Sequence, residues 1–174
     1  MKVLLGVAGS IAAYKACELV RLLVKRGDDV RVAMTAHARE FVAPLTFQTL
    51  SRNPVACDMF AEPGEWRPEH ISLAEWAEFV LVAPATANIL AKMAHGIADD
   101  LLSSVLLAAR SPVAVAPAMN DGMWANPATQ ANVAALSARG VRIVSPGEGA
   151  LACGTSGKGR MAEPAEIISK CFAQ

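Results

Sequence analysis

Residues 2–10 read KVLLGVAGS, and residues 11–27 continue as IAAYKACELVRLLVKRG. The predicted strand, Lys2 to Ala8, is almost entirely apolar and partly β-branched, which is typical of a strand buried in a parallel sheet. Gly9 ends this strand, and Ser10 is predicted to cap a helix that runs to about Arg26 and ends at Gly27. A buried strand that leads into an amphipathic helix is the first half of a βαβ unit, so this stretch predicts an α/β protein.

The same alternation continues along the chain. Four more buried strands are predicted, at Val30–Met34, Phe79–Ala83, Val113–Ala116 and Val141–Val144. The predicted helices are Ala38–Val42, Thr46–Ser51, Thr86–His95, Asp99–Ala109, Asn126–Gly140 and a last one from about Pro164. The other predicted segments are a short strand at Pro54–Phe60, a polar stretch at Ala61–Glu69 and a glycine-rich loop at Gly147–Gly159. This order predicts a three-layer α/β/α, Rossmann-like fold with a doubly wound, mostly parallel sheet in a single domain, residues 1–174.

The composition narrows the classes of function. Of the 174 residues, 53% are hydrophobic and 18% are charged, and 16 Lys and Arg balance 16 Asp and Glu. A net charge of zero argues against nucleic acid or an anionic membrane as a partner, and this much apolar surface argues against disorder. A small neutral chain with few charges is instead expected to associate with copies of itself.

Neither a leader peptide nor a metal site is indicated. The apolar run after Lys2 is too short for a signal peptide, and no run reaches the ~18 apolar residues of a membrane span, so a cytoplasmic protein is expected. The four cysteines are scattered and form no C-x-x-C pair: Cys17, Cys57, Cys153 and Cys171. We therefore expect no zinc, no other metal and no disulfide framework.

Ligands of doubly wound sheets bind beyond the carboxyl ends of the strands, where the strand order reverses. The residues that follow the predicted strands are small or carry hydroxyl or amide groups, and none is acidic: Gly9-Ser10, Thr35, Pro84–Asn88, Pro117–Asn120 and Ser145-Pro146. A rim without carboxylates, with Ser10 at a helix N-terminus, favours a phosphate group.

Two observations favour a mononucleotide over a dinucleotide. Residues 6–11, GVAGSI, lack the G-x-G-x-x-G spacing, and Thr35 stands where a dinucleotide site has an Asp or Glu for the ribose. A hydroxyl at that position favours a phosphomonoester such as that of FMN. The alternative, that these hydroxyls only cap helices, stays open at this point.

Several motifs, in order along nearly the whole chain, resemble the FMN-dependent cysteine decarboxylases. They are Gly9–Lys15 (GSIAAYK), Pro44–Phe47 (PLTF), His70–Leu73 (HISL) with Trp76-Ala77, Ala83–Asn88 (APATAN), Gly96–Leu102 (GIADDLL) and Pro117–Asn120 (PAMN) with Met123-Trp124. Leu151–Gly154 (LACG), then Gly157 and Gly159–Met161, resemble the substrate-covering loop, at about 147–161, of the members that act on phosphopantothenoylcysteine.

The resemblance implies FMN as the cofactor and a phosphorylated cysteine conjugate as the substrate. Together with the positions after the strands, it predicts that FMN binds to Gly9, Ser10, Ile11, Thr35, Pro84, Thr86, Ala87 and Asn88. By resemblance, Asn120 binds the substrate carboxylate and amide. The other residues predicted to contact substrate are Met119, as part of the pocket wall, and the loop cations Lys158 and Arg160, for which a phosphorylated substrate would be a partner. Simpler interpretations stay open, because an Asn can cap a turn and cations of a solvated loop need no ligand.

Two residues receive catalytic roles from the resemblance. His70 is the expected proton acceptor for the substrate thiol, a role that suits an unperturbed pKa of ~6.5. Cys153 is the expected proton donor of a final reduction, on a loop whose glycines suggest a closing lid. The alternatives are an ordinary surface histidine, as we expect for His37 and His95, and an inert thiol. Asp99 and Asp100 are expected only to begin a helix.

The activity that the resemblance implies is decarboxylation of 4′-phospho-N-pantothenoylcysteine to 4′-phosphopantetheine in coenzyme A biosynthesis. Three alternatives are a decarboxylase acting on the C-terminal cysteine of a peptide, a flavin prenyltransferase and a non-catalytic FMN-binding regulatory subunit. His70, Asn120 and Cys153 together favour the first interpretation. The resemblance also implies a homotrimer, or a dodecamer of four trimers. It leaves open whether the chain stands alone or is half of a bifunctional protein with a ligase domain.

Overall fold

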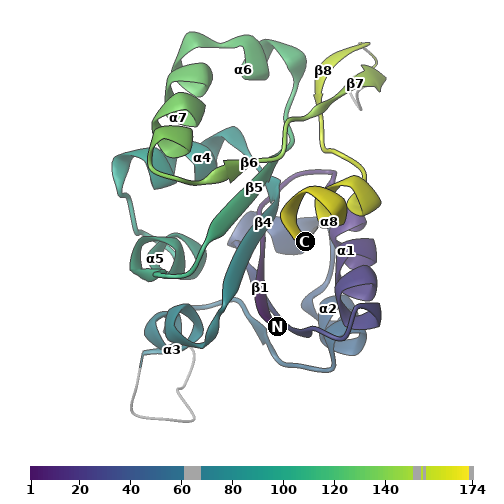
Figure 1. Cartoon of the computed structure of the whole chain (residues 1–174), viewed down its shortest axis with the longest axis vertical. Helices are drawn as coiled ribbons and strands as arrows, with labels where there is room; N and C mark the ends of the chain where they lie inside the picture. Colours follow the sequence, from purple (N-terminus) through teal and green to yellow (C-terminus); the bar gives the residue numbers. More distant parts are fainter. Residues whose placement is uncertain (61–67, 151–153, 155, 173–174) are drawn as a thin grey trace.

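The computed structural model describes residues 1–60, 68–150, 154 and 156–172. Within these residues, six parallel strands form one sheet in the order β3-β2-β1-β4-β5-β6 (Figure 1). The strands are β1 (Lys2–Val7), β2 (Asp29–Met34), β3 (Val55–Ala56), β4 (Phe79–Ala85), β5 (Val113–Pro117) and β6 (Arg142–Ile143). The predicted doubly wound sheet is confirmed. Its strand order reverses between β1 and β4, so their carboxyl ends form the switch point at which such folds bind ligands.

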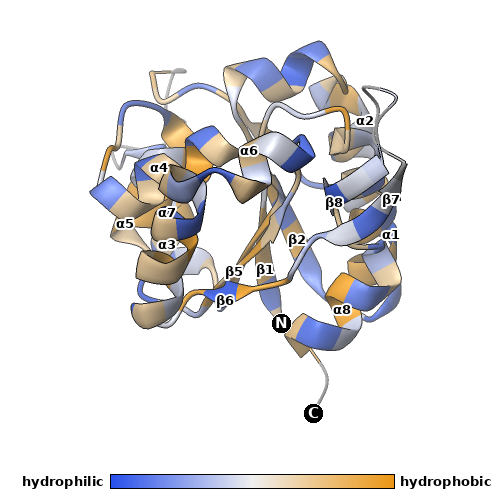
Figure 2. Cartoon of the chain, turned by 90° about the horizontal axis from the view of Figure 1, so that it is seen from above, coloured by the Kyte–Doolittle hydropathy of each residue, from blue (hydrophilic) through white to orange (hydrophobic). Residues whose placement is uncertain are grey.

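Two groups of helices cover the sheet, one on each face, as Figure 2 shows. One face carries α3 (Glu69–Trp76), α4 (Ala87–His95), α5 (Leu101–Ala108) and α7 (Pro127–Ala138). The other carries α1 (Ala13–Lys25), α2 (Pro44–Ser51) and α8 (Pro164–Phe172). Two single-turn elements, the 3-10 helix η1 (Ala36–Glu40) and α6 (Asp121–Ala125), follow β2 and β5. The three predicted layers are therefore present.

The core consists of two apolar clusters that the sheet separates. Because successive side chains of a strand point to opposite faces, Leu5 packs with Leu19 of α1, whereas its neighbour Leu4 packs with Leu90 of α4. All four side chains are fully buried. Strands buried on both faces explain why the predicted strands are continuous apolar runs rather than alternating ones.

Several predicted boundaries are wrong. The first helix begins at Ala13, not after Ser10, because residues 10–15 first form tight turns with Ala13 N–H donating to the Ser10 carbonyl at 2.9 Å. Strand β4 continues through Pro84 to Ala85, since Pro84 takes part in the sheet through its carbonyl, which accepts from Ala8 N–H at 3.2 Å. The segment predicted as Ala38–Val42 is a 3-10 helix at Ala36–Glu40.

Two functional segments also differ from prediction. No helix was predicted around His70, but it lies in the first turn of α3, which begins at Glu69 and buries only Leu73 and Ala74. The glycine-rich loop is largely an antiparallel hairpin of β7 (Gly147–Ala150) and β8 (Ser156–Arg160). Helix α3 has only eight residues, two of them buried, and the hairpin strands are rich in glycine, so neither element gives a clear periodic signal.

Candidate functional site

A cavity of about 690 Å³ lies at the switch point of the sheet. Its wall is made by the residues that follow three strands: Ala8–Ile11 after β1, Thr35–His37 after β2 and Thr86–Ile89 after β4. Ala118 and Met119, directly after β5, complete this part of the wall. The cavity therefore occupies the position predicted for the ligand.

Seven of the eight residues predicted to bind the cofactor line this cavity: Gly9, Ser10, Ile11, Thr35, Thr86, Ala87 and Asn88. Pro84 does not line it, because it is buried within β4. Their binding role stays a prediction, but residues from distant parts of the sequence meet on one surface.

Three hydroxyl groups of the wall are oriented by backbone hydrogen bonds. The side-chain oxygen of Ser10 accepts from Ala12 N–H at 3.2 Å, that of Thr35 from Ala38 N–H at 3.2 Å, and that of Thr86 from Ile89 N–H at 3.3 Å. In the described part of the chain, none of these hydroxyls donates a hydrogen bond. Capping and ligand binding are thus compatible, since the capping oxygen accepts and its O–H proton remains for a ligand.

The first turn of α4 adds backbone donors to this wall. Thr86 caps the helix, and Ala87 and Asn88 line the cavity. The first N–H groups of a helix have no partner within it and carry a partial positive charge, which favours an anion.

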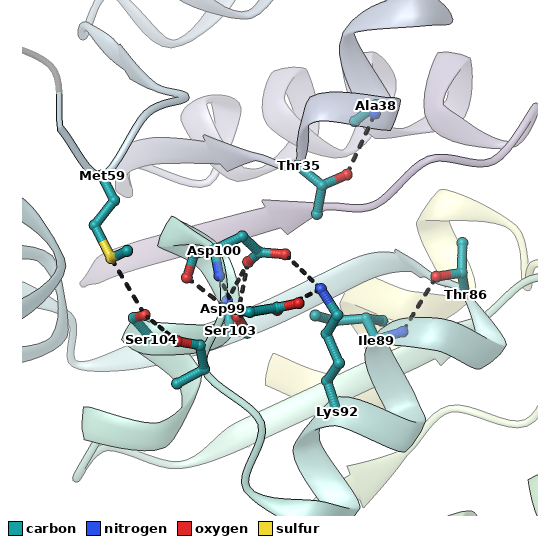
Figure 3. Close-up of polar contacts among 11 residues, drawn as sticks. Thr35, Ala38, Met59, Thr86, Ile89, Lys92, Asp99, Asp100, Ser103 and Ser104 are labelled. Carbon is teal, nitrogen blue, oxygen red and sulfur yellow. Dashed lines mark hydrogen bonds and ion pairs between the residues drawn. The ribbon is translucent and has the colours of Figure 1, made fainter.

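Lys92, Asp99 and Asp100 form an ion-pair network beside the cavity that the sequence did not reveal (Figure 3). Lys92 Nζ lies 2.6 Å from Asp99 Oδ1 and 2.9 Å from Asp100 Oδ2, and Lys92 and Asp100 line the cavity. Asp100 also caps α5, accepting from Ser103 N–H at 2.7 Å. The expected helix-starting role is confirmed for Asp100. The only feature of the sequence that points to Lys92 is its four-residue spacing from Asn88. This spacing places Lys92 on the same face of α4 as a residue predicted to bind the cofactor.

Lys92 and Asp100 both keep their charges at neutral pH. Burial acts to raise the pKa of Asp100, but the Ser103 N–H and Lys92 outweigh it and leave this pKa below its usual value. Burial acts to lower the pKa of Lys92, but the hydrogen bonds to Asp99 and Asp100 raise it overall. The rim thus contains a carboxylate, contrary to the expectation of a rim without acids, and its charge is compensated by Lys92.

His37 also lines the cavity, which the sequence did not suggest. It is exposed, as expected, but it lies against Gly9, where an added Cβ would come within 2.4 Å of His37 Cβ and 3.0 Å of its carbonyl carbon. Position 9 therefore accepts only glycine because η1 packs directly on the turn after β1. His95 is exposed at the end of α4, as expected.

His70 does not line the cavity of its own chain. It lies in α3, which packs against α5, the helix whose cap Asp100 does line it. The Nδ1 atom of His70 is buried and has no hydrogen-bond partner among the described residues. A buried ring nitrogen without a partner is uncommon and indicates a group available for another interaction.

Strand β8 lies directly on the segment that follows β5. Met119 N–H donates to the Gly159 carbonyl at 3.0 Å, and an added Cβ at Gly159 would lie 2.2 Å from the Met119 carbonyl oxygen. A Cβ at Gly157 would lie 2.8 Å from Asp121 Cβ. These glycines permit close contact between β8 and the segment after β5, and the expectation that the loop closes as a lid stays a prediction.

The residues predicted to bind substrate are divided between two surfaces. Met119 lines the cavity, whereas Lys158 lines a hollow of about 460 Å³ between α6 and β8, together with Trp124 and Gln130. Lys158 has no ion pair or hydrogen bond within the described part of the chain. Arg160 instead pairs with Glu163 at 2.6 Å.

Asn120 lies between these two surfaces and caps α6. Its Oδ1 accepts from Gly122 N–H at 2.9 Å, so the predicted turn cap is confirmed and its role toward substrate stays a prediction. Cys153 lies outside the described residues.

Among the described residues, no cluster of three or more His, Cys, Asp or Glu could hold a metal ion. No helix in that part of the chain is long and apolar enough to cross a bilayer.

Comparison with known proteins gives consistent results. A family model described as Flavoprotein matches residues 1–174. The chain is 51% identical over 175 residues to the coenzyme A biosynthesis bifunctional protein CoaBC of Bacillus subtilis (strain 168), covering 99% of this chain and 43% of that protein. It thus spans less than half the length of the curated relatives that it matches.

Two solved structures are similar over most of the chain. A PPC decarboxylase variant complexed with pantothenoylaminoethenethiol has a TM-score of 0.85 and 33% identity, covering 97% of this chain and 94% of that one. The FMN-dependent cysteine decarboxylase SpaF has a TM-score of 0.82 and 36% identity, covering 91% of this chain and 89% of that one.

Proposed function

The chain belongs to the flavoprotein family, and from this premise we propose that it binds FMN and removes carbon dioxide from 4′-phospho-N-pantothenoylcysteine. The product is 4′-phosphopantetheine, an intermediate of coenzyme A biosynthesis. The observation that carries this proposal is the 51% identity, over 99% of the chain, to a protein named for coenzyme A biosynthesis. The position and chemistry of the cavity support it.

The cavity wall suits FMN at its phosphate end. Ser10, Thr35 and Thr86 each retain an O–H donor, and the first turn of α4 adds backbone N–H groups. Donors of this kind bind a phosphomonoester without needing a cationic side chain. We assign the apolar parts of the wall, Ile11 and Met119, to the flavin ring.

The cofactor supplies a temporary oxidation at the thiol-bearing carbon of the substrate, so that the electrons of the breaking bond to the carboxylate have an acceptor. His70 takes the thiol proton at the start of the reaction. The Asn120 side chain, oriented by its bond from Gly122 N–H, holds the carboxylate with a neutral amide group. A neutral partner suits a carboxylate that must leave as carbon dioxide. We assign the last proton to Cys153 on the family resemblance alone.

We assign the substrate phosphate to Lys158. Of the two cations predicted for this role, Arg160 is paired with Glu163, whereas Lys158 has no partner among the described residues and stands at the hollow beside α6. An unpaired ammonium gains more from a phosphate than one that must leave a carboxylate. Residues of α6, the helix that Asn120 caps, line this hollow, so we place the two ends of one extended substrate at Asn120 and Lys158.

The direct test uses the purified chain loaded with FMN. We expect a yellow protein that releases carbon dioxide from phosphopantothenoylcysteine and yields fully reduced phosphopantetheine by mass spectrometry. A product that stops at the enethiol would favour a peptidyl-cysteine decarboxylase, for which a peptide ending in cysteine is the comparison substrate. A protein that takes up FMN without any turnover would contradict an enzymatic function, and a protein that cannot be loaded with FMN would contradict the whole proposal.

The cavity is open on an apolar side that we propose a second copy of the chain covers. Ile11, Phe41 and Met123 line the cavity and are 57%, 49% and 49% exposed. Large apolar side chains at the mouth of a ligand site are typical of an interface. A second copy would also offer a source for the catalytic histidine. The His70 of each chain does not line the cavity of that chain, but it could reach the cavity of a neighbouring copy.

Ile11→Glu tests this arrangement. We expect light scattering to detect a smaller species than the unaltered homo-oligomer, with FMN bound at least about tenfold more weakly, because a charge at an apolar contact must be desolvated. The matched control is Leu107→Glu, at a position that is 61% exposed but does not line the cavity. An Ile11→Glu protein of unchanged mass and FMN affinity would show that this surface is not covered by another copy.

A further inference from the structure

Lys15 is the only Lys or Arg among the buried residues of the described chain, with 7% of its surface exposed. It lies on α1, and its ammonium group binds the segment between β8 and α8. Nζ donates to the Met161 carbonyl at 3.3 Å and to Glu163 Oε1 at 2.9 Å. A buried ammonium group requires such partners, and an apolar side chain would pack there at lower cost. The presence of a lysine at this buried position therefore indicates that it fixes the position of the segment that it binds.

The segment that Lys15 holds is the direct continuation of β8. Met161 follows the last residue of the strand and is 1% exposed. Glu163 accepts from Lys15 and, through the same Oε1, from Arg160 at 2.6 Å. The hydrogen bond from Lys15 holds the pKa of Glu163 below its usual value, so this carboxylate is charged at neutral pH. One buried cation thus fixes the end of the strand at two points.

The other side of β8 is held by the segment after β5. Met119 N–H donates to the Gly159 carbonyl at 3.0 Å, and Gly157 lies against Asp121. Lys158 stands between these two glycines, at the hollow lined by Trp124 and Gln130. The position of Lys158 is therefore set by contacts on both sides of the strand, one of which is the Lys15 cluster.

We propose that Lys15 is a positioning residue for substrate recognition, which anchors β8 to α1 and so sets where Lys158 stands above the hollow beside α6. Lys15 itself lines neither the cavity at the switch point nor the hollow beside α6. The substrate part of this inference rests on the proposed function, whereas the anchoring part concerns the chain alone.

The anchor is tested by hydrogen exchange, measured by mass spectrometry on the FMN-loaded protein. In Lys15→Met we expect the amides of residues 156–160 to exchange at least about tenfold faster, the size expected for loss of a charge-assisted hydrogen bond. Glu163→Gln should change the same amides in the same direction, and because Glu163 is 54% exposed this variant does not threaten the core. The control is Arg21→Met, which removes a cation of α1 whose one ion pair among the described residues is with Glu18 of the same helix. Unchanged exchange at residues 156–160 in both test variants would overturn the proposal.

The positioning role is tested by kinetics with two substrates. We expect Lys15→Met to raise KM for phosphopantothenoylcysteine about tenfold with little change in kcat, and to leave KM for the unphosphorylated analogue and the Kd for FMN unchanged. Lys158→Ala should do the same, and the double variant should be no worse than the more affected single one, since both act through one contact. Additive effects, or an equal loss with both substrates, would overturn the positioning role. If the unaltered protein showed no turnover, the proposed function would fail, and the exchange comparison would still decide the anchor.

Discussion

His70→Asn is expected to lower the rate of carbon dioxide release by at least about a hundredfold, the usual contribution of a positioned general base. Asparagine is close to histidine in size and can hydrogen-bond, but it cannot accept a proton at neutral pH. His70 lies in the first turn of α3 and is partly exposed, so the variant should remain folded and retain FMN. A discontinuous assay of carbon dioxide release measures the rate, and a fluorescence titration with FMN measures the affinity for the cofactor.

The other two histidines make this experiment selective. His95→Asn, at an exposed position at the end of α4, should leave the rate unchanged. His37→Asn is the informative comparison, because His37 lines the cavity of its own chain and His70 does not. If His37→Asn abolished turnover while His70→Asn retained it, the role of base would pass to His37 and the assignment made from the sequence would be wrong.

Gly159→Ala should separate β8 from the segment after β5. The added Cβ would lie 2.2 Å from the Met119 carbonyl oxygen. Because this oxygen belongs to the backbone, it cannot rotate away as the end of a side chain could. We expect a loss of about 1–3 kcal/mol in unfolding free energy, as for overpacking of a buried site. We also expect a rise of at least about tenfold in KM for the phosphorylated substrate, since each 1.4 kcal/mol corresponds to a factor of about ten. Thermal unfolding and steady-state kinetics measure the two effects.

Gly147→Ala is the matched control in the same hairpin. A Cβ at that position would meet nothing closer than the Arg160 carbonyl oxygen at 3.9 Å, which is ordinary contact, so we expect stability and KM to change little. The pair separates two explanations for the glycines of this hairpin. If they served as flexible hinges, both substitutions would have similar, moderate effects. If the close contact of β8 with Met119 matters, only Gly159→Ala is severe.

The sequence predicted the sheet well because its strands are buried on both faces and therefore read as uninterrupted apolar runs. It also located the site, since residues after parallel strands meet at one edge whatever the details of packing. Thr35 and Thr86 show how far this extends: both were predicted from position alone, and both line the cavity. Helix α3 and the hairpin were missed because short elements with one or two buried side chains carry little periodicity.

The sequence by itself determined the features that depend on residues close together in the chain. These are the alternation of strands and helices, the caps at Thr86, Asp100 and Asn126, and the edge of the sheet at which a ligand binds. Only the tertiary structure decided that Lys92 neutralises the acids beside the cavity, that His70 lies outside it, and that Gly159 lies in close contact with Met119. The physical reason is the separation along the sequence of the residues that interact. A cap or a helical face joins residues within about four positions, whereas the bond from Lys15 to the Met161 carbonyl joins residues 146 positions apart. Such pairs meet only once the sheet has placed the elements that carry them.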